Sequence, residues 1–486
     1  MNTSIIRYIS GYILKIEGCL LLLPCLIAAI YNETTGIYYL GVGIFCMVVG
    51  MILSNKKPNN SVFYLKEGCV ATALSWILLS IFGAMPMFFS GEIPSYVNSL
   101  FETVSGFTTT GASILSDVEA LSHSSLFWRS FTNWIGGMGV LVFLLAIVPL
   151  TGGSHMNLMK AESPGASVGK LVPKVKYTAR ILYVIYFGLT LLEFIILLCG
   201  KMNWFEALNT SLATAGTGGF GFKNDSFASF SPYIKWTVTI FMILFSINFN
   251  AYYLIIFRQF KKAFSMEEVR AFLGIIVVAV AVIFSQLLRN SVNAFEALTD
   301  AAFQVASIIS STGFSTVDFN QWSVTSKTIL VLLMFVGACA GSTGGGIKVS
   351  RFIILIKSLG KELKSYIHPR NVSKIHFDGK PVEHEVVRAT NVYLITFFIL
   401  FVVSVLLVSL EGKDMVTNFT AVATTINNIG PGLEEVGPSG NFSGFTIFSK
   451  LVLIFDMLAG RLELFPLLIM FHPKVWKDMF SKKNKL

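Results

Sequence analysis

Apolar runs separated by short polar loops recur along the whole chain of 486 residues. Most of them approach about 20 residues, the length that an α-helix needs to cross the hydrocarbon core of a bilayer. The first run, 10–31, follows Arg7 and is interrupted by Lys15 and Glu17, and no small-residue cleavage site comes after it. We therefore interpret it as a retained span and not as a signal peptide. The pattern predicts an all-α polytopic membrane protein.

The runs form an N-terminal hairpin, with spans at 10–31 and 37–53, and then four similar units. Each unit has an apolar span, an amphipathic segment of about 10–12 residues that is too short to cross a bilayer, a polar loop with glycine, and a second apolar span. Such a segment fits a half-helix that enters the membrane from outside and ends midway. The expected elements are 68–90, 97–107 and 126–149 in unit one, 181–200, 204–215 and 232–257 in unit two, 267–288, 297–309 and 327–357 in unit three, and 390–410, 416–427 and 445–471 in unit four.

The four units recur at a spacing of about one hundred residues, which is typical of an internal repeat. The predicted fold is thus four pseudo-repeats of helix, pore helix with filter loop, and helix around a central pore, in addition to the hairpin. With two spans in the hairpin and two in each unit, the number of spans is even. The expected divisions are a hairpin at 1–60 and repeats at 61–160, 161–262, 263–365 and 366–486, the last with a cytoplasmic tail.

Charge supports the membrane assignment and adds an orientation. Only 13% of the residues are charged, against about 25% in an average soluble domain. The net charge of +10 would suit nucleic acid, but Lys and Arg are concentrated in alternate loops. This positive-inside pattern places both termini in the cytoplasm, and it makes membrane lipid, not nucleic acid, the expected contact of the basic loops. These loops are 56–66, 160–180, 258–270, 351–388 and 474–485.

Four polar loops, one in each unit, are the candidate functional site. Non-helical backbone at membrane depth implies a pathway lined by protein or water. A half-helix that ends there presents its carbonyls and the negative end of its dipole, which favours a cation. Glycine lets carbonyls turn inward, where they can replace the hydration shell of a monovalent cation. Ordinary extracellular turns are the alternative, which the fourfold recurrence disfavours. The candidate ligands are Thr109, Thr110 and Gly111 in loop 1, Thr217, Gly218 and Gly219 in loop 2, Ser311, Thr312 and Gly313 in loop 3, and Asn428, Ile429 and Gly430 in loop 4.

A run of small residues interrupts the second span of unit three. It reads Gly341-Ser342-Thr343-Gly344-Gly345-Gly346, with Lys348 two positions later. A straight helix is not expected here, because each glycine costs about 1 kcal/mol relative to alanine. The run is not a phosphate-binding P-loop, since Ile347 separates Gly346 from Lys348. We predict a flexible intramembrane loop that obstructs the pathway and moves to open it. Close packing of helices through small residues is the alternative.

Arg461 lies inside the last apolar span, where an ionisable residue is costly and usually faces a cavity or a partner. We predict that it lines the pathway below the four loops and forms a barrier to cations, with a snorkelling arginine near the cytoplasmic end as the alternative. Glu463 points to another face and is a poor direct partner. Several outer carboxylates either concentrate cations at the mouth or form a solvated rim. They are Glu92, Asp117, Glu119, Asp318, Glu434 and Glu435.

The loops and the segments around them resemble the TrkH/TrkG group of bacterial potassium uptake subunits, within a superfamily that also contains KtrB and the fungal Trk and plant HKT transporters. The resemblance covers almost the whole chain. It implies uptake of K+ across the bacterial inner membrane through a four-loop filter, with the small-residue run as a gate. The motifs that carry it are 105–112, 135–140, 218–220, 311–316, 340–348 and 427–432.

The resemblance also implies partners and a selectivity. Members of this family are homodimers in which each subunit has its own pore, and a soluble, nucleotide-binding TrkA-like subunit gates them from the cytoplasm. A serine in place of the first-loop glycine favours sodium in this family, so Gly111 favours potassium, with a sodium-selective or sodium-coupled transporter as the alternative. An enzyme is not predicted, because the sequence offers no nucleophile–base pair and no carboxylate or histidine cluster at the midplane. The coupling ion, whether proton, sodium or none, stays open.

Overall fold

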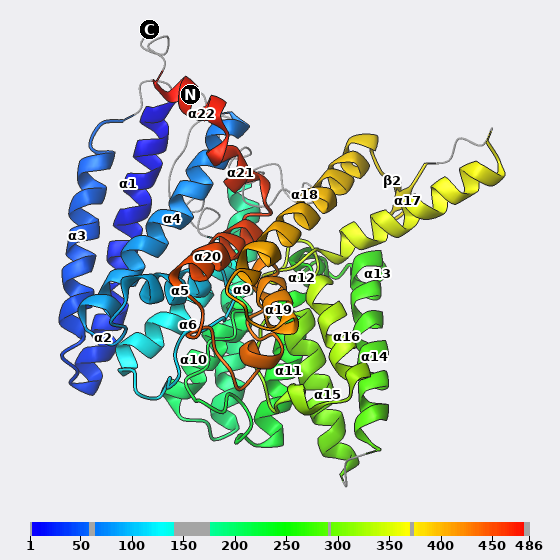
Figure 1. Ribbon diagram of the computed structural model, residues 1–486, viewed down its shortest axis with the longest axis horizontal. Helices are drawn as coiled ribbons and strands as arrows, with labels where there is room; N and C mark the ends of the chain where they lie inside the picture. Colours follow the sequence, from blue (N-terminus) through cyan, green and yellow to red (C-terminus); the bar gives the residue numbers. More distant parts are fainter. Residues whose placement is uncertain (1, 58–63, 140–174, 290–292, 370–373, 481–486) are drawn as a thin grey trace.

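The computed structural model describes residues 2–57, 64–139, 175–289, 293–369 and 374–480, and these are almost entirely helical (Figure 1). Their strands are the short antiparallel pair β1 (His376–Phe377) and β2 (Lys380–Pro381). Six helical segments within the described residues are long and apolar enough to cross a membrane, or seven if one bent pair counts as a single span. The chain is therefore a multi-pass helical membrane protein, as predicted.

The N-terminal hairpin consists of α1 (Thr3–Leu20), α2 (Leu22–Tyr31) and α3 (Gly36–Ser54), which lie against the first helix of unit one (Figure 1). The first span begins at Thr3, earlier than the sequence predicted, because Asn2 caps the helix and Ile5, Ile6 and Ile9 are buried in the bundle. Glycines allow α1 and α3 to approach closely. A Cβ on Gly11, Gly18 or Gly50 would lie closer than 3.0 Å to backbone atoms of the opposite helix.

Glu33, in the turn between α2 and α3, fastens the hairpin to unit one. Its carboxylate accepts hydrogen bonds from the backbone amides of His123 (2.7 Å) and Ser124 (3.1 Å) and pairs with the His123 ring (2.8 Å). The ring of Tyr31 stacks on that of His123 at a centroid distance of 3.8 Å. Burial raises the pKa of Glu33, but these hydrogen bonds outweigh burial and hold the pKa below its usual value. The carboxylate thus caps the helix that begins at His123.

Glu33→Gln should lower the stability of the folded protein by about 1 kcal/mol at pH 7, because one charged acceptor of several hydrogen bonds is lost. Since the folded-state pKa of Glu33 is lowered, its contribution is present at neutral pH and disappears as the pH falls below about 4. Thermal melting of the detergent-solubilised protein measures both effects. The curves of the variant and the wild type should converge in acid, and a constant difference at every pH would contradict the assignment.

Each of the four units contains a first helix, a half-helix and a second helix, and the half-helices begin and end close to their predicted positions. Unit one has α4 (Leu65–Phe89), α5 (Tyr96–Phe107) and α6 (His123–Gly137). Unit two has α9 (Val175–Cys199), α10 (Trp204–Gly216) and α11 (Pro232–Ser246). Unit three has α14 (Glu267–Leu287), α15 (Ala294–Ile309) and α16 (Val324–Phe335), and unit four has α18 (His384–Ser409), α19 (Met415–Ile426) and α20 (Ile447–Arg461).

The second spans of units two and four were predicted as continuous helices at 232–257 and 445–471, and this prediction is wrong because both are broken. The break predicted inside the second span of unit three, 327–357, is present. In unit two, α11 bends by 92° into α12. In units three and four, α16 and α20 end in non-helical backbone before the next helix begins. Part of the span predicted at 126–149 lies outside the described residues. The helices that complete these units are α12 (Phe249–Ile256), α13 (Phe260–Ser265), α17 (Val349–Ile367), α21 (Phe465–Phe471) and α22 (Pro473–Phe480), with 3-10 turns η1 (Phe319–Gln321) and η2 (Glu434–Val436).

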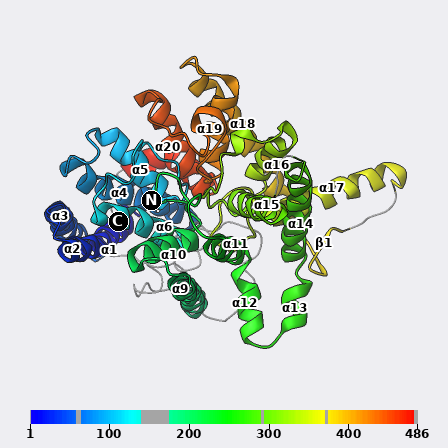
Figure 2. The same ribbon diagram turned by 90° about the horizontal axis from the view of Figure 1, so that it is seen from below.

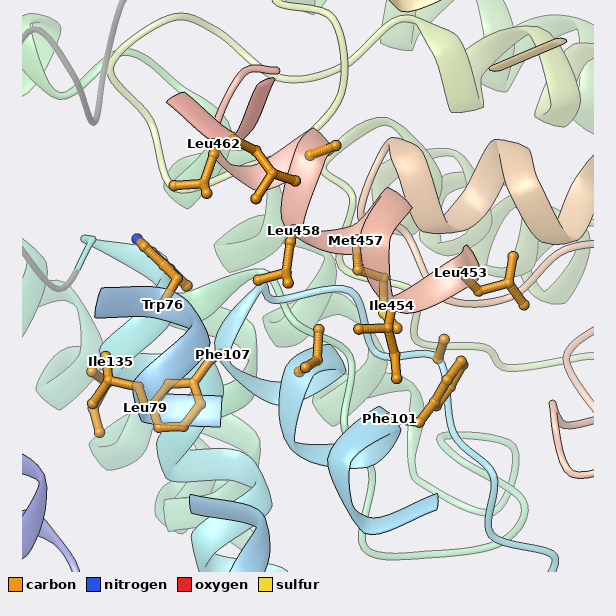
Figure 3. Packing of buried hydrophobic residues seen from close by; sticks show 14 of the residues in the cluster. Trp76, Leu79, Phe101, Phe107, Ile135, Leu453, Ile454, Met457, Leu458 and Leu462 are labelled. Carbon is orange, nitrogen blue, oxygen red and sulfur yellow. The ribbon is translucent and has the colours of Figure 1, made fainter. Parts of the chain in front are cut away.

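In units one, three and four, the second helix or the segment that follows it contacts the C-terminal end of the half-helix of the same unit. A Cβ on Gly136, Gly344 or Gly460 would lie closer than 3.0 Å to the carbonyl oxygen of Phe107, Ser310 or Ile426, respectively. Small residues are therefore required at these contacts. Units one and four also share a large apolar core, in which Trp76, Phe107 and Met457 are buried between α4, α5, α6 and α20 (Figure 3). This packing fixes the half-helices at the centre of the bundle.

Candidate functional site

All four half-helices end in the same backbone geometry. The first residue after α10 and the second residue after α5, α15 and α19 have a positive φ, 52° at Thr217, 56° at Thr109, 59° at Ser311 and 56° at Asn428. Two backbone hydrogen bonds close each end, as from Thr110 N–H to Ser105 C=O (2.8 Å) and from Thr109 N–H to Gly106 C=O (3.0 Å). This is the Schellman arrangement of a helix C-terminus. A threonine in the left-handed region is strained, which is typical of a functional site.

Two positions further on, each loop has a glycine with positive φ, and these four glycines form a closed ring. The φ values are 77° at Gly111, 68° at Gly219, 87° at Gly313 and 100° at Gly430. A Cβ added to any of them would lie closer than 3.0 Å to a carbonyl oxygen of another loop. The oxygens met in this way belong to Gly218 for Gly111, to Thr312 for Gly219, to Ile429 for Gly313, and to Thr110 for Gly430.

The structure thus brings together all of the predicted loop residues in one register: Thr109, Thr217, Ser311 and Asn428 in the first position, Thr110, Gly218, Thr312 and Ile429 in the second, and the four glycines in the third. Loop 2 has glycine in the second position, where the other loops have threonine or isoleucine, because the buried Asn133 of α6 occupies the space that a side chain of Gly218 would need. A Cβ on Gly218 would lie closer than 3.0 Å to the Asn133 amide group. Asn428 instead bridges two loops, since its Nδ2 donates to Thr110 Oγ1 (2.9 Å) and to the carbonyl of Met457 (2.9 Å).

A buried ion pair behind loops 1 and 2 escaped the sequence analysis. The side chains of Glu102, on α5, and Arg129, on α6, are 0% and 2% exposed and lie 2.8 Å apart. Glu102 accepts a hydrogen bond from the amide of Ile114 (3.0 Å), and Arg129 donates to the carbonyl of Gly221 (3.0 Å) and lies over the ring of Phe220. The pair therefore fixes the chain that follows both loops. An arginine within an apolar span was the available signal.

On the side of the loop residues that follow the glycines, the ring opens into a cavity of about 150 Å³ that reaches Gly111, Gly219, Gly313 and Gly430. Its described lining is mainly backbone, serine and asparagine, with two basic residues and no carboxylate. The outer carboxylates are engaged elsewhere, as in the hydrogen bond from the Ser122 amide to Glu92 (2.7 Å). The solvated-rim interpretation of these acids therefore fits better than a ring of carboxylates at the mouth.

Below the loops, the small-residue segment 341–346 is held against three neighbours. The amide of Gly345 donates to Ser311 Oγ (2.5 Å), directly under loop 3. The amide and hydroxyl of Thr343 donate to the carbonyl of Phe245, which is one of the free carbonyls at the end of α11 (3.3 and 3.0 Å). The Lys348 ammonium donates to the carbonyl of Gly344. The segment thus packs directly against loop 3 and against the end of α11.

Arg461 joins this segment to unit one. Its guanidinium donates to the carbonyls of Thr343 (3.0 Å) and Gly137 (2.8 Å) and to that of Gly136, and it lies 5.9 Å from the ring centroid of Trp76. These partners place the guanidinium between the small-residue segment and the end of α6, and its role as a barrier to cations stays a prediction. Glu463 pairs with Arg351 of α17, in agreement with the expectation that it is not the partner of Arg461.

Glu268, near the start of α14, is a second residue that the sequence did not single out. Its side chain is buried, and its Oε1 accepts hydrogen bonds from the amides of Ala340 (2.7 Å) and Ser350 (3.1 Å). Its Oε2 accepts one from Asn248 Nδ2 (3.4 Å), at the bend between α11 and α12. Glu268 thus connects both ends of the small-residue segment to this bend. The described residues contain no group of three or more His, Cys, Asp and Glu that could hold a metal ion.

Comparison with known proteins agrees with this fold. The chain is 33% identical to the Trk system potassium uptake protein TrkH of Escherichia coli K12, over 98% of this chain and 100% of that protein. It is 30% identical to the TrkG protein of the same strain, with the same coverage. The crystal structure of the potassium transporter TrkH from Vibrio parahaemolyticus superposes with a TM-score of 0.88 at 30% identity, covering 98% of this chain and 100% of that one.

The match to a family extends over most of the chain. Residues 39–483 match the TrkH family, which is described as a cation transport protein. This description excludes an enzyme and agrees with the absence of catalytic groups that the sequence analysis noted. The chain belongs to the TrkH family of cation transport proteins.

Proposed function

We propose that this protein is the pore subunit of a potassium uptake system in the bacterial inner membrane. The observation that carries the proposal is the closed ring of four loops, in which each glycine lies against a carbonyl of another loop. Inward carbonyls of such a ring replace the hydration shell of K+ at the narrowest point of the pathway. The relatives named above, which are potassium uptake proteins, support potassium as the cargo.

The first- and second-position residues act with the glycines as the filter. The half-helices α5, α10, α15 and α19 point their C-terminal ends at the ring, and these ends carry partial negative charge. That charge stabilises a dehydrated cation at the ring without a fixed carboxylate. Gly111 favours potassium over sodium, and a sodium-selective or sodium-coupled transporter is the competing function. Each repeat, 61–160, 161–262, 263–365 and 366–486, contributes one loop to the filter in this proposal.

The gate lies directly below the filter. It comprises the small-residue segment 341–346, Lys348 and Arg461. Lys348 and Arg461 both donate hydrogen bonds to carbonyls of the segment, and an amide of the segment donates to Ser311 of loop 3. Glycine-rich backbone can move aside at low cost, and the guanidinium charge opposes a cation while it stays in place. Opening then requires the Arg461 contacts with Thr343 to break.

Both termini and the basic loops lie in the cytoplasm in this proposal, in accordance with the positive-inside rule. A TrkA-like nucleotide-binding subunit docks on this face and acts on the gate, and the protein forms a homodimer with one pore in each subunit. The membrane potential drives uptake with about 2.3 kcal/mol per charge for each 100 mV. A coupled proton or sodium ion would add to this driving force.

The test is complementation of a bacterial strain that lacks potassium uptake. Expression of the protein with its soluble partner should restore growth at low potassium, and rubidium influx should exceed sodium influx. Gly111→Ser, with the same level of protein in the membrane, should shift this ratio towards sodium. Rescue that depends on sodium would favour the competing function, and absence of rescue with both proteins present would count against the proposal.

A further inference from the structure

The hairpin α12–α13 projects from the bundle at the junction between units two and three (Figure 2). Because α12 makes an angle of 92° with α11, it lies roughly along the membrane plane where α11 crosses the membrane. The turn between the helices is tight, since Arg258 has a φ of 58° and the amide of Gln259 donates to the carbonyl of Leu254 (2.8 Å). This is the orientation of an interfacial helix, not of a span.

The hairpin has two different faces. One face packs against α14 in a small core made by Ala251 and Ala263 of the hairpin and Val269 of α14. The other exposes large apolar side chains beside basic ones. The exposed apolar residues are Ile256, Phe257, Phe260 and Phe264, with exposed fractions between 52% and 66%, and the exposed basic residues are Arg258, Lys261 and Lys262.

The hairpin has no carboxylate between Phe249 and Met266, so its three basic side chains are a local excess of positive charge. The nearest acidic residues in sequence have other partners and do not neutralise this charge. Glu267 pairs with Lys357, and Glu268 accepts the hydrogen bonds described above. Apolar aromatic side chains next to exposed lysine and arginine, on a helix lying in the membrane plane, are complementary to an anionic lipid surface.

The base of the hairpin touches the candidate gate. The amide of Phe249, the first residue of α12, donates to the carbonyl of Gly341 (3.0 Å). Asn248 caps α12 through the amide of Asn250 (2.9 Å), and its other side-chain atom donates to Glu268. A change in the position of α12 therefore acts on both the small-residue segment and the residue that holds its two ends.

We propose that the α12–α13 hairpin binds anionic lipid headgroups of the cytoplasmic leaflet and that this binding biases the gate. The coupling to the gate rests on the proposed function, whereas the lipid binding does not. Each basic residue near an anionic surface strengthens binding by about fivefold. Removal of Arg258, Lys261 and Lys262 together should therefore remove most of the lipid binding.

The experiment uses the purified full-length protein in vesicles of phosphatidylcholine, alone or mixed with phosphatidylglycerol. Tracer rubidium uptake is measured in both, and the phosphatidylglycerol retained in detergent is counted by mass spectrometry. The wild type should take up rubidium faster with phosphatidylglycerol. The triple variant R258Q/K261Q/K262Q should lose this stimulation and the retained lipid, but keep the uptake seen in phosphatidylcholine. Asn248→Ala should retain the lipid and lose the stimulation.

The matched control, K201Q/K235Q/K327Q, removes the same charge from exposed or half-exposed lysines outside the hairpin and outside the basic loops and should respond as the wild type does. An equal loss in both triple variants would overturn the proposal, as would normal stimulation of R258Q/K261Q/K262Q. If this variant kept its lipid response and lost only the response to an added soluble subunit, the hairpin would be a protein-docking site and the proposal would be wrong. If no vesicle showed cation-selective uptake, the proposed function would fail, and the lipid count would still test the hairpin.

Discussion

Gly219→Ala should strongly reduce selective potassium uptake while the folded protein still accumulates in the membrane. Gly219 has a φ of 68°, and a Cβ there would lie closer than 3.0 Å to the carbonyl oxygen of Thr312. That carbonyl cannot move aside without leaving its place in the ring. A non-glycine residue in such a conformation costs about 1–3 kcal/mol. If this cost falls on the ion-bound state, it corresponds to about a 5- to 150-fold loss, since about 1.4 kcal/mol is tenfold.

Growth at low potassium and the ratio of rubidium to sodium influx measure this effect. Gly91→Ala is the matched control, because Gly91 has a similar φ of 81° but no heavy atom within 4 Å of the added Cβ. It carries the same backbone strain without the contact at the ring, and it should retain uptake. If Gly219→Ala kept both the rate and the ion preference of the wild type, loop 2 would not be part of the filter.

The half-helices and their loops were predictable because each leaves a local mark in the sequence. An amphipathic segment too short to span, followed by Thr or Asn and then Gly, recurs four times, and Asp or Asn residues cap three of the helices, as Asn203 caps α10. The alignment of the four loops with one another was also predictable, since each loop has a glycine at the position where a carbonyl of the neighbouring loop comes close. What the sequence did not indicate was that residues such as Thr109 adopt a left-handed conformation, which a β-branched side chain disfavours.

The breaks in the second helices of units two and four were not predictable from hydropathy. Both segments are apolar on each side of the break, so hydropathy averaged over about 20 residues predicts a single span. The break at Ser246 is stabilised from another unit, because the amide of Thr343 in the small-residue segment donates to the carbonyl of Phe245 and the amide of Cys339, just before the segment, donates to that of Ser246. Contacts between residues about one hundred positions apart, such as Cys339 N–H to Ser246 C=O (3.1 Å), leave no local pattern. The pairing of Glu102 with Arg129, 27 positions apart, had the arginine within an apolar span as its signal, but nothing in the sequence indicated its partner.

Arg461→Ala should increase cation flux in the absence of the soluble subunit by about tenfold or more. The substitution removes the hydrogen bond to the carbonyl of Thr343, and with it one of the links between the small-residue segment and α20. It also removes a positive charge below the filter. A unit charge about 5 Å from a passing cation opposes it by about 3 kcal/mol at an effective dielectric constant of about 20, and water in the pathway reduces this value.

Two further variants separate the charge from the contacts. Arg461→Gln removes the charge and keeps a donor, so its flux should approach that of Arg461→Ala if repulsion dominates. Arg461→Lys keeps the charge but lacks the planar fork that reaches both Thr343 and Gly137, so its flux should lie between the wild type and Arg461→Ala. Rubidium flux in vesicles without the soluble subunit, normalised to the protein present, gives the comparison. Equal flux in the wild type and all three variants would remove Arg461 from the gate, and the small-residue segment would then have to obstruct the pathway without it.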